Sequence, residues 1–546
     1  MKYSSLSLVP CLAVLGALVV ADSRFVTRPE LAVPKLNITV PARAGEVGEG
    51  LIFVAPYLGF EEGSHGPTQP GAYIFRDDGE LVWSGVGYHA GWVANFRPDT
   101  WDGKPYLRSF QGRLDGPHGR MYGFHTLLGD DYELAKKVQV GNHRLVSAHE
   151  FKLIEGKTVL VETPTPVVVS LSPWGGSKDQ NWIVSELDIE TGDVLFEWQS
   201  FDHVDPKSES LSFTCRIDEA DDVNVESAFP LDFGPGIPGS GRNETDAWNY
   251  FHINSVDKDD EGNYLISARN LAAVLKINGT SGNVIWQLGG YRGGSDFALQ
   301  EEDIFAFQHH ARFRGRYDDG NIEIISLFDN GAHSAPINKI HPTSRARIYE
   351  LSHRTSTARA IRTYEAPDGL SAHTQGSVQP LENGNIFVNW GQAGAVTEYR
   401  NDGKVLFHSY LDSKPNRFAQ SYRGWRLPWV GKPAEEPAVT ARVSDSATLD
   451  IYVSWNGDTE TFKWRFYAQR AGGKSRLLGE VKREGFESHL DFHEEFDIKG
   501  TLIIAQAIGG DGAVLRQSKP VSVDHVAAHP GEFDGSSLQW ALNEEL

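Results

Sequence analysis

Cysteine is scarce in this sequence: its 546 residues include only Cys11 and Cys215. Cys11 lies in an apolar N-terminal segment, so removal of that segment would leave Cys215 alone, and no intramolecular disulfide could form. The chain is therefore not a small scaffold held by disulfides, and its stability must come from a large apolar core. We interpret Cys215 as a small buried hydrophobic residue.

Positive charge and long apolar runs are also scarce. Asp and Glu number 73 against 51 Lys and Arg, a formal net charge of −22, so nucleic acid is not an expected partner. Residues 6–21 are apolar and predict a secretory signal peptide over residues 1–21, with a signal anchor as the alternative. No other segment is apolar enough for stable membrane insertion. Glycosylation triplets at Asn37, Asn243 and Asn278 fit a secreted, extracellular glycoprotein.

Several catalytic motifs are missing. The sequence has no Gly-x-x-x-x-Gly-Lys-Ser/Thr loop, no His-Glu-x-x-His and no Gly-x-Ser-x-Gly. Their absence disfavours nucleotide-dependent transfer and simple serine hydrolysis, and no cofactor is expected.

The dominant pattern is a repeated hairpin: an apolar strand, a turn rich in Asn, Asp and Gly, and a second apolar strand that often ends in Trp. Such turns tolerate positive φ and are typical of tight hairpins. Trp83, Trp198 and Trp286 are expected to pack between the repeats. The six copies are residues 73–83, 124–138, 187–198, 274–286, 347–364 and 396–407.

A histidine leads the segment that precedes several copies, and Gly-Asn follows it after nine or ten intervening residues. The histidines are His252, His310 and His373, with His149 in a looser version. One repeat per blade predicts a six-bladed β-propeller over residues 22–431, in which closure of the ring hides the sheet edges.

The pattern changes after the propeller region. Residues 432–437 are rich in Pro and Glu and predict a linker, and residues 438–525 alternate as in a small immunoglobulin-like β-sandwich. Residues 526–546 predict an acidic tail. The expected fold is thus all-β: a six-bladed β-propeller followed by a small sandwich.

The histidines should converge, because the innermost strands of a propeller surround its axis. Side-chain alternation places His252 and Asn254 on one face of a strand, with Arg269 near the same rim. His309 and His310 are neighbours, so only one should face the channel, and Arg312 should share the face of His310. Imidazoles beside a guanidinium form an anion site.

Two other interpretations of these histidines stay open. Each could be a structural group at the start of a strand, or three could bind zinc. A nearby Arg269 or Arg312 disfavours a cation, so no metal is expected.

Four fragments together resemble the arylsulfotransferase (arylsulfate sulfotransferase) family, and its fungal secreted branch in particular. They are Phe-His-Ile-Asn-Ser-Val-Asp at 251–257, Asn-Tyr-Leu-Ile-Ser-Ala-Arg at 263–269, Ile-Trp-Gln-Leu-Gly-Gly at 285–290 and Phe-Gln-His at 307–309. The resemblance covers roughly residues 50–430. It implies a six-bladed propeller and transfer of a sulfuryl group from a phenolic sulfate ester to a phenol, through a sulfohistidine and without a nucleotide sulfate donor.

The resemblance also implies roles for the candidate residues. His309 would be the nucleophile, with His252 and Arg269 as the other catalytic residues, because they would hold the sulfuryl oxygens. The substrate-binding candidates are His149, Asn254, His310, Arg312 and His373. Activity is expected to fall below roughly pH 6, where an ordinary histidine becomes protonated.

The expected partners are a small aryl sulfate and a phenol. Two alternatives to the transferase remain. One is a non-catalytic extracellular propeller that binds a phenolic, a glycan or a protein, and the other is a metal-dependent lyase or hydrolase.

Overall fold

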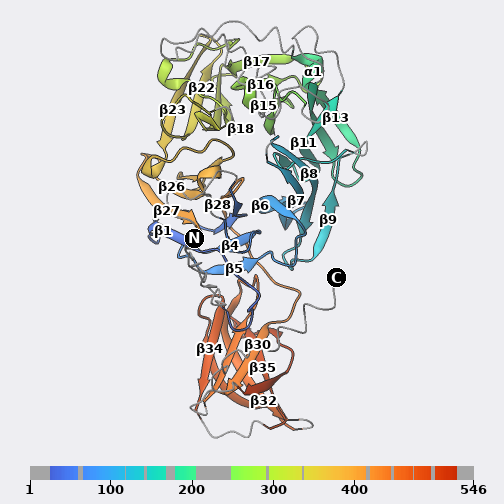
Figure 1. The fold of residues 1–546 in the computed structure, drawn as a ribbon, viewed down its shortest axis with the longest axis vertical. Helices are drawn as coiled ribbons and strands as arrows, with labels where there is room; N and C mark the ends of the chain where they lie inside the picture. The colour runs from blue at the N-terminus through green and yellow to red at the C-terminus, as the bar shows by residue number, and fades with distance from the viewer. Residues whose placement is uncertain are drawn as a thin grey trace, which may run out of the picture.

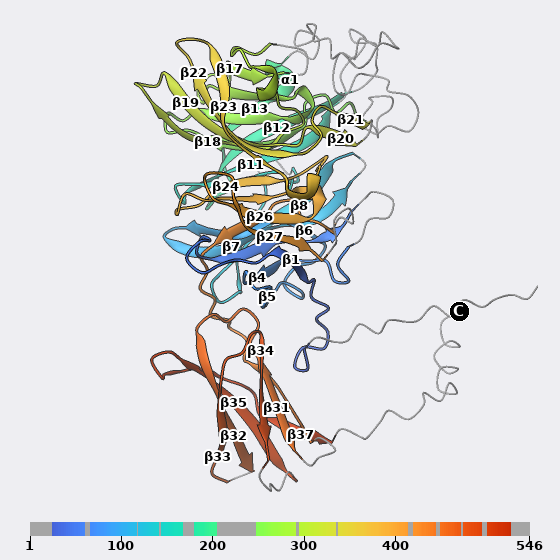
Figure 2. The ribbon, with the colours of Figure 1, turned by 90° about the vertical axis from the view of Figure 1, so that its left-hand side faces the viewer.

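The strands form a ring of sheets with a second group of strands at one side of it (Figures 1 and 2). The ring is a six-bladed β-propeller, as the sequence predicts. The predicted signal peptide, Cys215, Asn243 and the acidic tail lie outside the described residues. The computed structural model describes residues 25–59, 66–116, 118–140, 144–167, 179–204, 247–290, 294–334, 337–412, 419–443, 448–470, 473–493 and 499–525.

Four blades are continuous in sequence, and each is a four-stranded antiparallel sheet in chain order. Their first strands contact one another in turn around the ring, so these strands are innermost. The strands are β6 (Trp92–Trp101), β7 (Lys104–Asp115), β8 (Arg120–Leu128) and β9 (Leu134–Val138); β10 (Phe151–Ile154), β11 (Thr158–Val167), β12 (Asp179–Asp188) and β13 (Val194–Gln199); β14 (Ile253–Lys258), β15 (Tyr264–Ala268), β16 (Ala273–Ile277) and β17 (Val284–Gly289); and β18 (His309–Tyr317), β19 (Ile322–Asp329), β22 (Arg345–Ser352) and β23 (Thr357–Glu365).

The other two blades close the ring with segments distant in sequence. One has the order β29-β2-β4-β5, and the other has the order β1-β27-β26-β25-β24, so strands from the two ends of the propeller chain pair within blades (Figure 1). This pairing protects sheet edges that would otherwise be open. The strands are β1 (Leu36–Val40), β2 (Leu51–Val54), β4 (Tyr73–Phe75), β5 (Leu81–Ser84), β24 (Ser377–Pro380), β25 (Ile386–Asn389), β26 (Ala395–Tyr399), β27 (Val405–Leu411) and β29 (Trp425–Leu427).

Five of the six hairpins expected from the sequence are the outer two strands of a blade, and the sixth, β26–β27, is covered on its outer side by β1. Their turns use glycine where the backbone needs positive φ, as at Gly79 and Gly403, both at φ 90°. Trp83, Trp198 and Trp286 are at most 4% exposed and lie in three separate apolar clusters, which confirms their expected packing role.

Short elements complete the ring. No helix in the described part of the chain has the length and apolar character needed to cross a bilayer. The short elements are β3 (Tyr57–Leu58), β20 (Ala332–Ser334), β21 (Ile337–Lys339), β28 (Ala419–Gln420), α1 (Ser200–His203), η2 (Arg269–Leu271), η3 (Glu301–Asp303), η4 (Pro367–Gly369) and η5 (Gly391–Ala393).

The C-terminal strands form one hydrogen-bonded path in the order β33-β32-β35-β37-β30-β31-β34, with β36 on β35. An immunoglobulin-like sandwich for this region stays a prediction. The strands are β30 (Ala438–Val443), β31 (Leu449–Ser454), β32 (Thr461–Arg470), β33 (Arg476–Lys482), β34 (Glu487–Phe492), β35 (Thr501–Gly509), β36 (Val514–Gln517) and β37 (Val521–His525).

This C-terminal region is tied to the propeller by hydrogen bonds. The Tyr132 hydroxyl donates to the Gly457 carbonyl at 2.7 Å. The Asn456 side chain accepts from the Ser84 N–H at 2.8 Å and donates to the Ser84 carbonyl at 2.9 Å. The strands after the predicted linker therefore dock on the blade of β5 and on the turn after β8.

Candidate functional site

Unusual backbone marks the start of three innermost strands. His252, Phe307, His310 and Gln375 have φ between 53° and 68°, a left-handed region that costs a non-glycine residue roughly 1–2 kcal/mol. The pairing register also shifts early in β14 and between His309 and Arg312 in β18. Side chains therefore do not simply alternate between the two faces of the strand here. The expectation that His310 and Arg312 share a face depended on that alternation and loses its basis.

Three histidines from three blades meet beside one tyrosine. The rings of His149 and His252 are 5.0 Å apart, centroid to centroid, at 80°. The Tyr422 ring lies 5.6 Å from His149 and 6.4 Å from His309. The structure thus brings together His149, His252 and His309, which the sequence places up to 160 residues apart.

His309 has a defined tautomer. Its Nδ1 lies 2.7 Å from the Asn330 side-chain oxygen, which only accepts, so Nδ1 carries the proton. Its Nε2 accepts the Gln375 N–H at 3.1 Å. Burial, and then the charge of Arg269, hold the pKa of His309 well below its usual value. His309 is therefore a neutral imidazole whose lone pair is on Nε2, and attack by that lone pair requires release of the Gln375 N–H.

Arg269 supplies positive charge next to this imidazole. It is 3% exposed and donates to the His373 carbonyl at 2.9 Å and to the Asn270 side chain at 3.0 Å. Its guanidinium carbon lies 5.5 Å from the Phe307 ring centre. Burial lowers the pKa of Arg269 to about 9, so it remains charged at neutral pH. Its buried Nε–H has no partner among the described residues, which leaves it available to an anion.

His252 is also neutral. Its Nδ1 lies 3.0 Å from the Asn249 amide nitrogen, which assigns the ring proton to Nε2. Burial, and then His149 and Arg269, lower the pKa of His252 far below its usual value. His252 can therefore donate a hydrogen bond from Nε2 without carrying charge.

Tyr422 is a site residue that the sequence did not reveal. It lies between β28 and β29, is 2% exposed, and its hydroxyl has no partner among the described residues. Burial raises the pKa of Tyr422, so it stays a neutral phenol. Nothing local marks it, because its position depends on ring closure by β29.

His310 faces away from the other three histidines. Its Nδ1 accepts the Val378 N–H at 3.2 Å, and its ring packs 5.2 Å from Trp425. His309, rather than His310, is the member of this pair that faces the Tyr422 ring.

Arg312 belongs to a separate buried ion cluster. Its guanidinium bonds Glu150 at 2.5 Å, and Arg423 bonds the same carboxylate at 3.1 Å. Arg423 also donates to the carbonyls of His149 at 2.6 Å and Asn254 at 3.0 Å. The cluster joins the innermost strands rather than presenting Arg312 to a ligand. No pattern in the sequence pointed to Glu150 or Arg423.

The two remaining candidates contribute mainly through their main chains or structural bonds. The Asn254 amide donates to the Gln308 carbonyl at 2.7 Å. The His373 carbonyl accepts from Arg269, and its N–H donates to Gln392. Both therefore support the segments that carry His309, in β18, and Arg269, in η2.

Other polar features lie away from the histidines. Among the described residues, the group with metal-ligand geometry is Asp450, His489 and Asp491 on the C-terminal strands.

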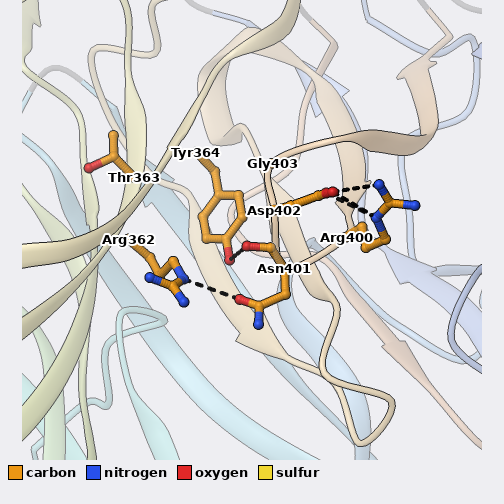
Figure 3. Close-up of a pocket in the computed structure, with 7 residues that line it drawn as sticks. All are labelled: Arg362, Thr363, Tyr364, Arg400, Asn401, Asp402 and Gly403. Atoms are coloured by element: carbon orange, nitrogen blue, oxygen red, sulfur yellow. Dashed lines mark hydrogen bonds and ion pairs between the residues drawn. The ribbon is translucent and has the colours of Figure 1, made fainter.

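One surface pocket, about 500 Å³, lies between β23 and the turn at residues 400–403 (Figure 3). There Arg362 bonds the Asn401 side chain at 3.2 Å, so the pocket belongs to a contact between outer strands.

Comparison with known proteins identifies one family. The sequence profile described as Arylsulfotransferase (ASST) matches residues 97–412, which extend from β6 to the end of the propeller's last full blade. No curated protein matches the chain.

The similar solved structures are distant. A protein of unknown function from Bacteroides caccae is 12% identical, with a TM-score of 0.35, and the match covers 69% of this chain and 98% of that one. An aldose sugar dehydrogenase from Streptomyces coelicolor is 10% identical, with a TM-score of 0.20, and the match covers 49% of this chain and 80% of that one. Likeness at this level does not bear on function.

Proposed function

The chain belongs to the arylsulfotransferase (ASST) family, and we propose that it transfers a sulfuryl group from a phenolic sulfate ester to a phenolic acceptor through a sulfohistidine at His309. One observation carries the proposal. A buried neutral imidazole with its lone pair on Nε2 lies within the field of Arg269, whose Nε–H has no partner among the described residues.

The proposed first step is attack by His309 Nε2 on the ester sulfur. The N–S bond forms as the S–O bond to the aryl group breaks, and negative charge grows on the oxygens. Arg269 and the Nε2–H of His252 would stabilise that charge, because prearranged donors are most effective in a buried site. In the second step an acceptor phenol attacks the sulfohistidine and restores His309.

Secretion is part of the proposal. It is supported by the apolar residues 6–21 and by glycosylation triplets at Asn37 and Asn278, whose side chains are not buried. Membership of the fungal secreted branch stays a prediction from the sequence fragments.

Mass spectrometry after brief exposure to an aryl sulfate tests the intermediate. We expect one added SO₃ on the peptide that contains His309, and loss of this adduct when a phenol is added. An adduct on another residue, or release of the phenol with no adduct at any time, would contradict the sulfohistidine.

Replacement of Arg269 by Met should lower kcat/KM for 4-nitrophenyl sulfate by about 10²-fold, because one buried donor contributes roughly 3 kcal/mol to the transition state. Arg269→Lys should recover part of the loss. Steady-state kinetics check this, and an unchanged rate in the Met variant would rule out the charge role of Arg269.

The pH below which activity is lost should be lower than the value near 6 that the sequence predicts. His309 has a pKa well below the ordinary one, so the nucleophile stays neutral as pH falls. We expect initial rates with 4-nitrophenyl sulfate to hold between about pH 7 and about pH 5.5, a range in which an ordinary histidine becomes protonated. A rate that titrates near pH 6.5 in folded protein would refute this.

A further inference from the structure

His149 differs from its two neighbours because a buried carboxylate contacts its ring. His149 Nδ1 lies 2.6 Å from Glu162 Oε1, and the two side chains are 2% and 0% exposed. The Ser147 hydroxyl is 2.7 Å from the same nitrogen. Glu162 is held in the middle of β11, where its carbonyl accepts the Ser147 N–H at 3.0 Å. Two chain segments therefore fix this pair.

Burial makes an unpaired charge on Glu162 costly. Burial raises the pKa of Glu162, and His149 is the strongest influence opposing that rise. An ionised carboxylate at this depth needs a cationic partner. By contrast, burial and Arg269 keep His252 and His309 neutral.

The other charged groups near His149 already form ion pairs with one another. Arg423 donates to the His149 carbonyl and bonds Glu150, which also pairs with Arg312. Tyr422, which packs on the ring, is kept neutral by burial. Glu162 is thus the carboxylate that contacts the imidazole of His149.

We propose that the Glu162–His149 pair is the proton carrier of the site, with His149 as the acid that protonates the leaving phenol and Glu162 as the positioning residue that keeps the proton on it. This inference rests on the proposed sulfuryl transfer. As the S–O bond breaks, the electron pair goes to the phenol oxygen, which takes the proton of His149 Nε2. In the second step His149 Nε2 takes the proton of the acceptor phenol while its oxygen bonds to sulfur and the N–S bond breaks. Protons and charge balance over the two steps.

The role predicts a dependence on the leaving phenol. An acidic phenol such as 4-nitrophenol leaves without help, whereas phenol itself, with a pKa of about 10, needs a proton. In a first turnover without acceptor, Glu162→Gln should therefore change the rate of ester cleavage by only a few-fold with 4-nitrophenyl sulfate, yet lower it by about 10²-fold or more with phenyl sulfate. Wild-type turnover of phenyl sulfate should fall as pH rises and the pair loses its proton, and the variant should lack that dependence.

Glu323→Gln is the matched control. Glu323 is buried on β19, contacts the half-buried His353 at 3.0 Å and pairs with the buried Lys276, so its replacement also breaks a Glu–His contact, but not one with the clustered histidines. Any effect of this control should be equal for the two esters. An equal loss for both esters in Glu162→Gln would overturn the proton role and leave only a structural one.

Two further readouts separate this inference from the proposed transfer. The Glu162→Gln protein should still gain the SO₃ adduct on His309 from 4-nitrophenyl sulfate. Nitrogen NMR of the wild-type protein should show one buried imidazolium at neutral pH, absent in Glu162→Gln. If wild-type protein forms no adduct and turns over neither ester, the transfer itself fails; if it does both but shows no imidazolium, only the proton carrier fails.

Discussion

A His309→Ala protein should release 4-nitrophenol from 4-nitrophenyl sulfate at least about 10³-fold more slowly than the wild-type protein, because no covalent intermediate can form without the nucleophile. The neighbouring donors can still bind the sulfate group, so KM should change far less than kcat. Absorbance of nitrophenolate in steady-state assays measures both constants.

The adjacent histidine provides the matched control. His310→Ala removes a buried imidazole of the same size from the next position, but that ring packs on Trp425 and not beside Tyr422. It should destabilise the protein while its folded fraction retains most of the kcat. A larger loss of kcat in His310→Ala than in His309→Ala would reverse our assignment of the nucleophile.

Glu150→Gln should lower the free energy of unfolding by about 3–5 kcal/mol, because it leaves two buried guanidinium groups without their shared carboxylate. Glu150 is 0% exposed, and its partners Arg312 and Arg423 come from distant parts of the ring. Chemical denaturation followed by tryptophan fluorescence measures the loss. Glu350→Gln, which breaks the exposed pair with Arg359, should cost at most about 1 kcal/mol.

The difference between wild type and Glu150→Gln should shrink in acid. Burial alone would raise the pKa of Glu150, but Arg312 and Arg423 outweigh it and hold that pKa below its usual range. The stabilisation is therefore complete above the unfolded-state pKa of about 4.3 and is lost as pH falls through the lower folded-state value. A difference that stays constant down to about pH 2 would show that the carboxylate charge is not its source.

Local turn chemistry made the blades predictable. The Asp-Gly turn that ends at Gly79 and the Asn-Asp-Gly turn that ends at Gly403 each supply a residue that adopts positive φ. Each hairpin is therefore encoded by the few residues of its own turn.

The repeat also pointed to His149 and His252, but its other two histidines, His310 and His373, do not join the cluster, and His309 was indicated by the family resemblance. Convergence of histidines from several blades was expected from the ring, and the structure decides that His309 is the third member.

The parts that escaped prediction depend on strand pairing and ring closure, which bring together residues that the repeat pattern does not relate. Tyr422 lies beside the histidines only because β29 completes the blade of β2, β4 and β5. Glu162 contacts His149 across the β10–β11 hairpin of one blade. His309 and His310 have different surroundings because the pairing register shifts in β18, and the periodicity of the sequence does not reveal such a shift.

The sequence by itself determined the six hairpins, the all-β class and the set of histidines that could share an axis, since these depend on neighbours along the chain. Only the tertiary structure decided which imidazole faces Tyr422, which nitrogen holds its lone pair, and which histidine has a carboxylate against it. Those properties depend on burial and on partners such as Asn330, Arg269 and Glu162, which lie close in space because the ring is closed.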